Sequence, residues 1–230
     1  MIIAEIGVNH NGDMSIAKYL ISEAINAGAD AVKFQLFHIE KYKNLQLSEA
    51  QIKELHDFCH GEIEFLCTPF DHEAIDFLEP LVSRYKVASG QANDVQFLEH
   101  INSKGKPVIL STGMSEFADI RHSLAVLDIP VTLLHCVSLY PTPPEKAALW
   151  RIKAMQDAFS CPIGYSCHVP GINMALAAKT LGATVIEKHL TFDKNAQGPD
   201  HSSSILPEEL MALVRGCKEI DVALSPDSTS

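Results

Sequence analysis

The feature that most constrains the fold of this chain is an alternation, repeated eight times, of short apolar runs and longer segments with helical periodicity. The apolar runs are often rich in β-branched residues, as buried parallel strands are, and they cover residues 2–6, 31–35, 63–67, 85–88, 107–110, 131–137, 162–165 and 184–189. The helical segments between them cover residues 14–27, 48–60, 72–78, 94–102, 116–127, 144–159, 171–181 and 207–224. Eight such units in 230 residues average about 29 residues, close to the roughly 30 of a strand–helix repeat.

This pattern predicts an α/β fold, specifically a single-domain (β/α)8 barrel over residues 1–224, followed by a frayed tail at residues 225–230. The structural alternative is an open, doubly wound sheet. Such a sheet usually has fewer strands and carries a glycine-rich GxGxxG turn after the first strand, whereas the chain reads GVNHNG there. The sequence therefore favours the barrel.

Composition excludes several classes of protein. The chain has 18 basic and 29 acidic residues, a formal net charge of −11, which argues against nucleic acid as its main partner. No apolar run approaches the roughly 18 residues of a membrane span, and the first residues lack the basic segment of a secretory signal. Six cysteines without a CxxC pair are typical of reduced thiols, so we expect a cytoplasmic protein that uses neither membrane nor nucleic acid.

Polar side chains gather where the predicted strands end. In a (β/α)8 barrel the chemistry takes place at the C-terminal ends of the strands, because the loops there meet at one rim. Polar residues crowd all eight of these ends, whereas the strand starts are mostly apolar. This bias predicts one functional pocket, and its candidate residues are Glu5, Lys33, Gln35, Thr68, Lys86, Ser89, Ser111, Ser138, Tyr140, Ser166, His168, Glu187, Lys188, His189, Asp200 and His201.

Three lysines among these candidates indicate an anion site. Lys33, Lys86 and Lys188 lie in or beside apolar strands, where an unpaired lysine is rare. Their convergence on one rim would favour a phosphate or carboxylate ligand, with nearby serine and threonine hydroxyls and glycine-adjacent N–H groups as neutral donors. The alternative is that each lysine reaches solvent or pairs with a glutamate.

Three histidines indicate a metal site. His168, His189 and His201 come from two adjacent strand ends, and neutral imidazoles are common ligands of divalent transition metals. A structural role for each histidine is the alternative. Glu5 and Glu187 could be general bases or could hold the lysines in place.

The same residues carry a resemblance to a known family. The segments AEIGVNHNG, ADAVKFQ, FLCTPFD, YKVASG, GKPVILSTGM, HCVSLYPTP, GYSCH and VIEKHLTFDKNAQGPDH resemble the sialic acid synthase family, the N-acylneuraminate synthases and their relatives. The match extends from residue 1 to about residue 224. The EKH and GPDH pair and the YPTP segment are its most specific parts.

The resemblance implies a barrel that condenses phosphoenolpyruvate with an aldose, typically of the N-acetylmannosamine type. The product would be a nine-carbon 2-keto-3-deoxy acid, with release of phosphate. By position, His168 and His189 match the ligands of a divalent metal, usually Mn²⁺, with Mg²⁺ or Co²⁺ as alternatives. The positions that match the phosphoenolpyruvate site are Lys33, Thr68, Lys86, Ser89, Ser111, Ser166 and Lys188.

Other matched positions bind the sugar or handle protons; they are Glu5, Gln35, Tyr140, Glu187 and Asp200. Among all candidates we assign the catalytic roles to Glu5, Lys33, Lys86 and Glu187. Ser138 and His201 are added to the substrate-binding group.

Four departures from the family pattern limit what the resemblance implies. The family normally continues into a small C-terminal antifreeze-like domain that reaches the partner subunit; since the chain stops at Ser230, we expect no domain-swapped dimer, although another homodimer stays open. Cys167 stands where GYSDH has aspartate, and Ser138 where many relatives have asparagine. The connection over residues 37–48 is shorter than usual.

These departures leave alternatives to the activity. One is condensation with a different or shorter aldose. Another is a non-catalytic scaffold that binds phosphoenolpyruvate or a sugar, or a component that needs a separate lid protein.

Overall fold

The computed structural model describes residues 1–38 and 40–225 of the chain. The expected tail therefore lies outside the described residues except for its first position. None of the helices in these ranges has both the length and the apolarity needed to cross a lipid bilayer.

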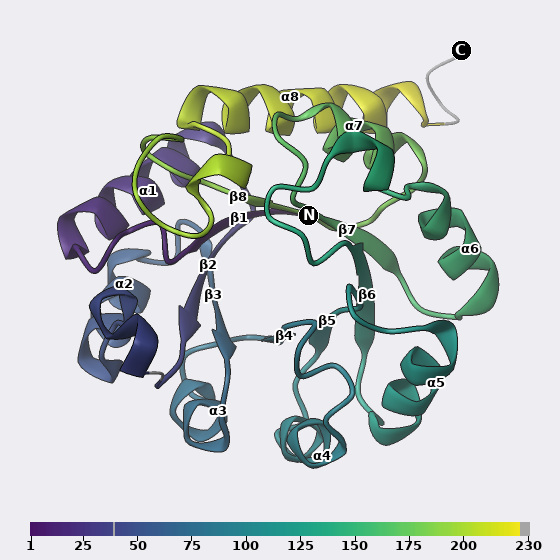
Figure 1. Cartoon of the computed structure of the whole chain (residues 1–230), viewed down its shortest axis with the longest axis horizontal. Coiled ribbons are helices and arrows are strands. Elements are labelled where there is room, and N and C mark those ends of the chain that lie inside the picture. Colours follow the sequence, from purple (N-terminus) through teal and green to yellow (C-terminus); the bar gives the residue numbers. More distant parts are fainter. Residues whose placement is uncertain (39, 226–230) are drawn as a thin grey trace.

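Eight parallel strands form one sheet that curves into a nearly closed barrel, with helices around it (Figure 1). The strands run in the order β3-β2-β1-β8-β7-β6-β5-β4, so the ends of the sheet, β3 and β4, complete the ring. The strands are β1 Ile2–Gly7, β2 Ala31–Leu36, β3 Glu64–Pro69, β4 Tyr85–Val87, β5 Val108–Ser111, β6 Val131–Cys136, β7 Ile163–Cys167 and β8 Ile186–His189. The predicted (β/α)8 barrel is confirmed.

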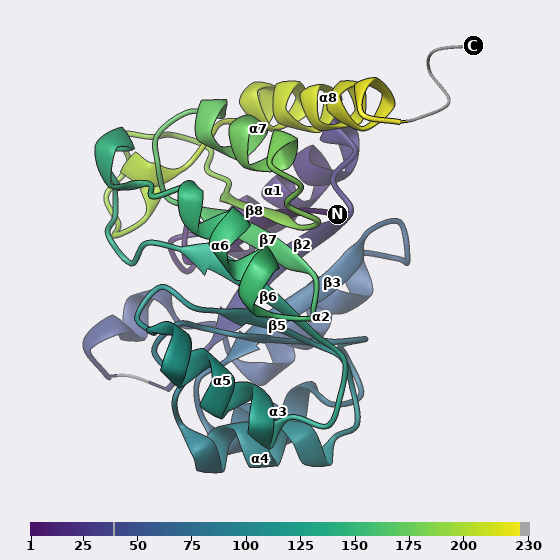
Figure 2. The same cartoon turned by 90° about the vertical axis from the view of Figure 1, so that its right-hand side faces the viewer.

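One α-helix follows each strand, and the helices lie on the outside of the sheet in both views (Figures 1 and 2). They are α1 Met14–Ala27, α2 Glu49–Phe58, α3 His72–Leu78, α4 Val95–Ser103, α5 Phe117–Val126, α6 Trp150–Ala158, α7 Asn173–Thr180 and α8 Pro207–Ala223. Short 3₁₀ helices, Glu40–Leu45, Pro144–Lys146 and His201–Ser203, lie in the connections at the C-terminal ends of β2, β6 and β8.

Side-chain caps explain where several helices begin. The Asp13 carboxylate accepts hydrogen bonds from two backbone N–H groups at the start of α1, and Gly28 ends that helix in the left-handed conformation. Ser48 and Gln51 form a capping box at the start of α2. These local signals are why the bounds of α1 agree with those predicted from the sequence.

The predicted helix at residues 144–159 is wrong at its start. The chain forms a 3₁₀ turn at Pro144–Lys146, and α6 begins only at Trp150. Between them Ala148 has a φ of 47°, a left-handed conformation that interrupts a right-handed helix. Helical periodicity alone did not reveal this interruption.

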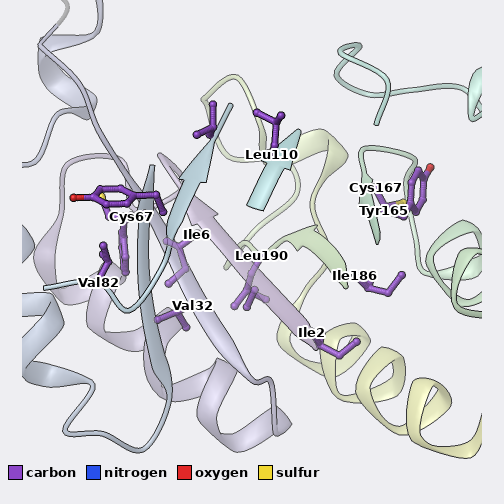
Figure 3. Packing of buried hydrophobic residues seen from close by; sticks show 14 of the residues in the cluster. Ile2, Ile6, Val32, Cys67, Val82, Leu110, Tyr165, Cys167, Ile186 and Leu190 are labelled. Carbon is purple, nitrogen blue, oxygen red and sulfur yellow. The ribbon is translucent and has the colours of Figure 1, made fainter. Parts of the chain in front are cut away.

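Two apolar layers support the barrel. A large layer between the strands and the helices contains Ile2, Ile6, Val32 and Leu110, which Figure 3 labels. A smaller layer fills the barrel interior below the strand ends, and its members are Ile3, Ala31, Leu66, Ile109, Leu134 and Val185.

The interior layer determines where the polar residues lie. Side chains two residues apart on a strand point to the same face. Two positions beyond Ile3 and Ala31 are Glu5 and Lys33, and two positions beyond Val185 is Glu187. The apolar layer is therefore a floor, and the inward side chains directly above it are polar.

Candidate active site

A cavity of about 390 Å³ opens above this floor, at the C-terminal ends of the strands. Fourteen of the sixteen predicted site residues line it: Glu5, Lys33, Gln35, Thr68, Lys86, Ser89, Ser111, Ser138, Tyr140, Ser166, His168, Glu187, His189 and Asp200. Lys188 and His201 do not. Alternation along each strand brings residues from all eight strands or their ends to one cavity.

Two lysines and two glutamates form a buried ionic cluster at the base of the cavity. Lys33 Nζ lies 3.1 Å from Glu5 Oε2 and 3.1 Å from Glu187 Oε2, and Lys86 Nζ lies 3.6 Å from Glu187 Oε1. The Ser166 hydroxyl donates to Glu187 Oε1 at 2.8 Å. Glu187 is thus the shared counter-charge of both lysines.

The two glutamates differ in how they hold a proton. Burial raises the pKa of Glu5 to about 7, against the opposing effect of Lys33. Burial acts on Glu187 in the same direction, but Lys33 and Lys86 outweigh it and hold the pKa of Glu187 below its ordinary value. Glu5 can therefore exchange a proton near neutral pH, whereas Glu187 stays ionised.

The lysines differ as well. For Lys33, the charges of Glu187 and Glu5 outweigh burial and raise its pKa. For Lys86, burial prevails and lowers the pKa. Lys33 also donates to the Thr68 hydroxyl at 3.3 Å. The cluster therefore combines a firmly charged ammonium group with one whose charge is less strongly compensated.

Hydroxyl groups line the wall beside Lys86. Gly113 N–H donates to Ser89 Oγ at 3.0 Å, and Ser89 Oγ lies 3.2 Å from Cys136 Sγ. A Cβ atom at Gly113 would come within 2.6 Å of Ser138 Oγ and 2.8 Å of Cys136 Sγ. Only glycine lets the backbone approach these side chains so closely. Burial raises the pKa of Cys136, which does not favour a nucleophilic thiolate.

A pair of imidazoles lies next to the cluster, where the Ser166 hydroxyl that donates to Glu187 is 3.4 Å from His168 Nε2. The rings of His168 and His189 are 5.6 Å apart, and the Tyr140 ring lies 4.0 Å from that of His168. His168 Nδ1 lies 2.8 Å from the Val137 carbonyl oxygen, which orients the ring. Burial lowers the pKa of His168 to about 4 and that of His189 well below its ordinary value, so both rings are neutral at neutral pH.

The imidazole pair fits a divalent cation. His189 Nδ1 is buried without a hydrogen-bond partner, an arrangement that is costly unless the atom has another role. The Val137 contact of His168 resembles the outer-shell hydrogen bonds that orient metal-binding histidines. In the described part of the chain, no group of three or more His, Cys, Asp or Glu side chains is arranged to hold a metal. The protein would thus supply two ligands and leave the other positions to water and substrate.

Asp200 and Gln35 complete the polar lining. Asp200 Oδ2 lies 3.9 Å from His189 Nδ1, and burial raises the pKa of Asp200 to about 6. Gln35 donates to Glu5 Oε1 at 2.9 Å. Asp200 thus lies beside an imidazole of the cavity and Gln35 beside a carboxylate.

Lys188 does not join the other two lysines, and the expected trio is corrected to a pair. Glu187, Lys188 and His189 are consecutive on β8, so the middle side chain points to the opposite face from its neighbours. The Lys188 amino group is buried behind the sheet and donates to three backbone carbonyls.

His201 is also outside the cavity lining. Its ring contacts Thr191 Oγ1 at 2.7 Å through Nδ1 and Asn11 Oδ1 at 3.1 Å through Nε2. These contacts hold one loop to another, as the structural alternative for this histidine expects. Both ring nitrogens have protein partners.

Cys167, at one of the departures from the family motif, also faces away from the cavity. It is buried beside Tyr165 in the layer between sheet and helices (Figure 3). Its sulfur lies 3.7 Å from the Val169 carbonyl oxygen. Cysteine in place of aspartate at this position therefore changes the packing behind the cavity and not the side chains that line it.

Sequence reasoning missed the apolar part of the cavity wall. Phe37 and Phe70 pack edge to face with ring centroids 6.0 Å apart, and both line the cavity with Leu45 and Met114. The signal in the sequence that could have found Phe37 and Phe70 is their position directly after the ends of β2 and β3. The cavity therefore has an apolar surface as well as a polar base.

Fold and site together define a class: a (β/α)8 enzyme whose buried lysine–glutamate cluster and imidazole pair share one cavity at the strand ends. The NeuB family model matches residues 38–228, and the chain belongs to this family. The predicted family and the predicted enzyme class, a phosphoenolpyruvate-dependent condensing transferase, are thereby confirmed.

Relatives whose activity is named are synthases of the same class. The chain is 40% identical to the N,N'-diacetyllegionaminic acid synthase of Campylobacter jejuni, over 97% of this chain and 77% of that protein. It is 37% identical to the N-acetylneuraminate-9-phosphate synthase of Mus musculus, over 97% of this chain and 70% of that protein. The crystal structure of the N-acetylneuraminic acid synthetase of Leptospira borgpetersenii, solved with citrate, superposes with a TM-score of 0.93 at 34% identity, covering 100% of this chain and 86% of that one.

Proposed function

We propose that this protein condenses phosphoenolpyruvate with an aldose of the N-acetylmannosamine type, giving a nonulosonic 2-keto-3-deoxy acid and phosphate. The observation that carries the proposal is the shared cavity, in which the Lys33–Glu187–Lys86 cluster faces the His168–His189 pair. The lysines of the cluster suit an anion, and the adjacent imidazoles suit a cation beside a carbonyl group. A condensation of these two substrates needs both.

In this proposal the hydroxyl-lined base binds phosphoenolpyruvate. Lys33 and Lys86 face its phosphate and carboxylate charges, and the hydroxyls of Thr68, Ser89 and Ser111 donate hydrogen bonds. Preorganised donors in a site shielded from water stabilise charge that builds up during reaction.

The aldose occupies the remaining space between Gln35, Tyr140 and Asp200. The apolar wall of Phe37 and Phe70 lies at this end and suits an acyl or methyl group on the sugar. Names of relatives span N,N'-diacetyllegionaminic, N-acetylneuraminate-9-phosphate and pseudaminic acid synthases, so the acceptor must be identified by experiment.

His168 and His189 would hold the divalent metal, which we propose to be Mn²⁺. When bound, it would supply Lewis acidity toward the sugar aldehyde. The bond that forms joins C3 of phosphoenolpyruvate to the aldehyde carbon; water adds at C2, and the C2–O bond to phosphate breaks. Glu5, with a pKa of about 7, is the group suited to pass protons, and Glu187 keeps both lysines charged and in place.

The test is a phosphate-release assay with phosphoenolpyruvate, Mn²⁺ and a panel of aldoses, read together with mass detection of the product. The panel includes N-acetylmannosamine, its 6-phosphate, diacetamido-trideoxy hexoses and shorter aldoses. We expect release with at least one acyl-bearing aldose, and its loss in His168→Ala. The matched control is Lys153→Ala, on the outer face of α6, which should behave as the parent protein.

If no aldose gives phosphate release while calorimetry detects bound phosphoenolpyruvate, the non-catalytic scaffold would replace the proposal. Release with a short aldose alone would replace the acceptor but keep the reaction. Full activity in His168→Ala would remove that residue from the metal site.

A further inference from the structure

The buried amino group of Lys188 is the strongest feature of the molecule that the proposed reaction leaves unused. Its side chain is fully buried on the outer face of β8. Nζ donates to the carbonyl oxygens of Cys167 at 3.2 Å, Val169 at 2.5 Å and Ser203 at 2.9 Å. Three carbonyl acceptors require three N–H donors, which only the ammonium form provides.

These three carbonyls flank two residues of the cavity. Cys167 and Val169 lie on either side of His168, so the ammonium group holds the backbone on both sides of this imidazole. Ser203 belongs to the 3₁₀ helix that directly follows Asp200. One side chain thus ties the end of β7 to the turn that presents Asp200.

A second tether holds the same turn from the side of β1. Asn9 Nδ2 donates to Leu190 O and to Ser204 Oγ, both at 2.9 Å. Ser204 Oγ in turn donates to the Asp200 carbonyl oxygen at 2.7 Å. The turn is therefore fixed at two points, and neither tether enters the cavity.

We infer that Lys188 is a positioning residue, which sets the placement of His168 and Asp200 through the backbone and is assisted by the Asn9–Ser204 tether. The inference rests on the proposed function, because it assumes that these two side chains bind metal and acceptor. Outer-shell partners of this kind change metal affinity or activity by about 10- to 100-fold when removed. A residue that only stabilises the fold would lower the melting temperature and leave these constants unchanged.

The experiment compares Lys188→Met, Lys188→Gln and Ser204→Ala with the parent protein. Lys194→Met is the matched control, since Lys194 lies on the same connection between β8 and α8 but pairs with Glu209 outside the cavity. Folding is checked by circular dichroism and thermal melting. The readouts are Mn²⁺ affinity from water-proton relaxation, and kcat and KM for both substrates.

We expect folded Lys188 variants with Mn²⁺ affinity and kcat reduced by about 10- to 100-fold, and with KM for phosphoenolpyruvate changed by less than about threefold. KM for phosphoenolpyruvate should change less than Mn²⁺ affinity and kcat, because Lys33 and Lys86, the proposed phosphoenolpyruvate ligands, lie on strands other than that of Lys188. Ser204→Ala should show the same pattern at about three- to tenfold, and Lys194→Met should match the parent.

Folded Lys188→Met and Ser204→Ala proteins with Mn²⁺ affinity and kcat within about twofold of the parent would overturn the inference. If Lys188→Met does not fold, Ser204→Ala decides by the same criteria. A parent protein that binds Mn²⁺ but turns over no aldose defeats the proposed function alone, and Mn²⁺ affinity still decides the positioning role. A parent that neither binds Mn²⁺ nor releases phosphate defeats both.

Discussion

Neighbouring side chains of one chemical type behave differently in this cavity because their partners differ. Glu5 and Glu187 are both buried and both lie 3.1 Å from Lys33 Nζ. Glu187 has a second ammonium group and the Ser166 hydroxyl as partners, whereas Glu5, among the residues that the structure describes, has only an amide donor besides Lys33. The number of charged partners decides which carboxylate stays ionised.

This contrast predicts unequal costs for two isosteric substitutions. Glu187→Gln strips the shared counter-charge from two buried lysines and should lower the free energy of unfolding by about 3–5 kcal/mol. Glu5→Gln mimics a protonated state that Glu5 already populates near pH 7, and it should cost less than about 1 kcal/mol. Urea denaturation at pH 7 measures both. Equal costs would show that the two glutamates carry the same charge in the folded protein.

A buried histidine outside the cavity predicts acid sensitivity. Burial lowers the pKa of His10 to about 4, and its Nδ1 accepts a hydrogen bond from Gly12 N–H at 2.9 Å. The unfolded chain binds this proton near pH 6.5 but the folded chain only near pH 4, so acidification across this window favours unfolding, by roughly 3 kcal/mol for this group.

His10→Asn keeps an acceptor and does not titrate. The stability difference between parent and variant should therefore shrink as pH falls from 6.5 to 4, in urea titrations at several pH values. The difference removes the contributions of all other titrating groups, because both proteins contain them. A difference that does not depend on pH would mean that the His10 ring is protonated equally in the folded and unfolded chains.

At the scale of elements, strand alternation explains both what the sequence predicted and what it did not. The floor residues and the polar residues two positions beyond them follow from the period of two, so the barrel and most of the cavity were predictable. A lysine in an apolar strand predicts an anion site at Lys188, but the same period of two turns its side chain away from those of Glu187 and His189. The start of α6 depended on the left-handed backbone at Ala148, for which alanine gives no sequence signal.

Close packing inside the barrel predicts a cost for one added methyl group on β7. A Cβ atom at Gly164 would lie 2.5 Å from Leu134 Cδ2 and 2.6 Å from the Val185 carbonyl oxygen. The Val185 carbonyl oxygen belongs to the backbone and cannot move aside as a side chain can. Gly164→Ala should therefore lower the free energy of unfolding by about 1–3 kcal/mol. Chemical denaturation measures the change. Gly90→Ala is the control, since nothing lies within 4 Å of its Cβ position, and a similar loss there would show that the cost is not one of packing.

At the scale of the whole molecule, the ring of strands is closed by two kinds of contact. Seven neighbouring pairs share backbone ladders, whereas β3 and β4, within the described residues, pack together without one. A side chain bridges this seam instead: Arg84 Nε, just before β4, donates to Glu64 Oε1 of β3 at 2.8 Å. The Tyr85 hydroxyl ties β4 to α3 by donating to the Ile75 carbonyl oxygen at 2.8 Å. The seam is the part of the barrel held least by the backbone.

Hydrogen exchange should therefore find the first opening of the barrel at this seam. Native-state exchange of β4 amides is expected to be faster than that of β1 and β8 by about tenfold or more, a difference of ~1.4 kcal/mol in the opening free energy, because β1 and β8 have ladders on both sides. Arg84→Met removes one bridge and should speed exchange in β3 and β4 while leaving β1 and β8 unchanged, since those strands do not contact the bridge. Equal protection in β4 and β8, or an Arg84→Met effect spread evenly over the ring, would mean that the barrel opens as one cooperative unit. In that case the lysine–glutamate cluster, which links β1, β2, β4 and β8 through its side chains, would be the contact that closes the ring.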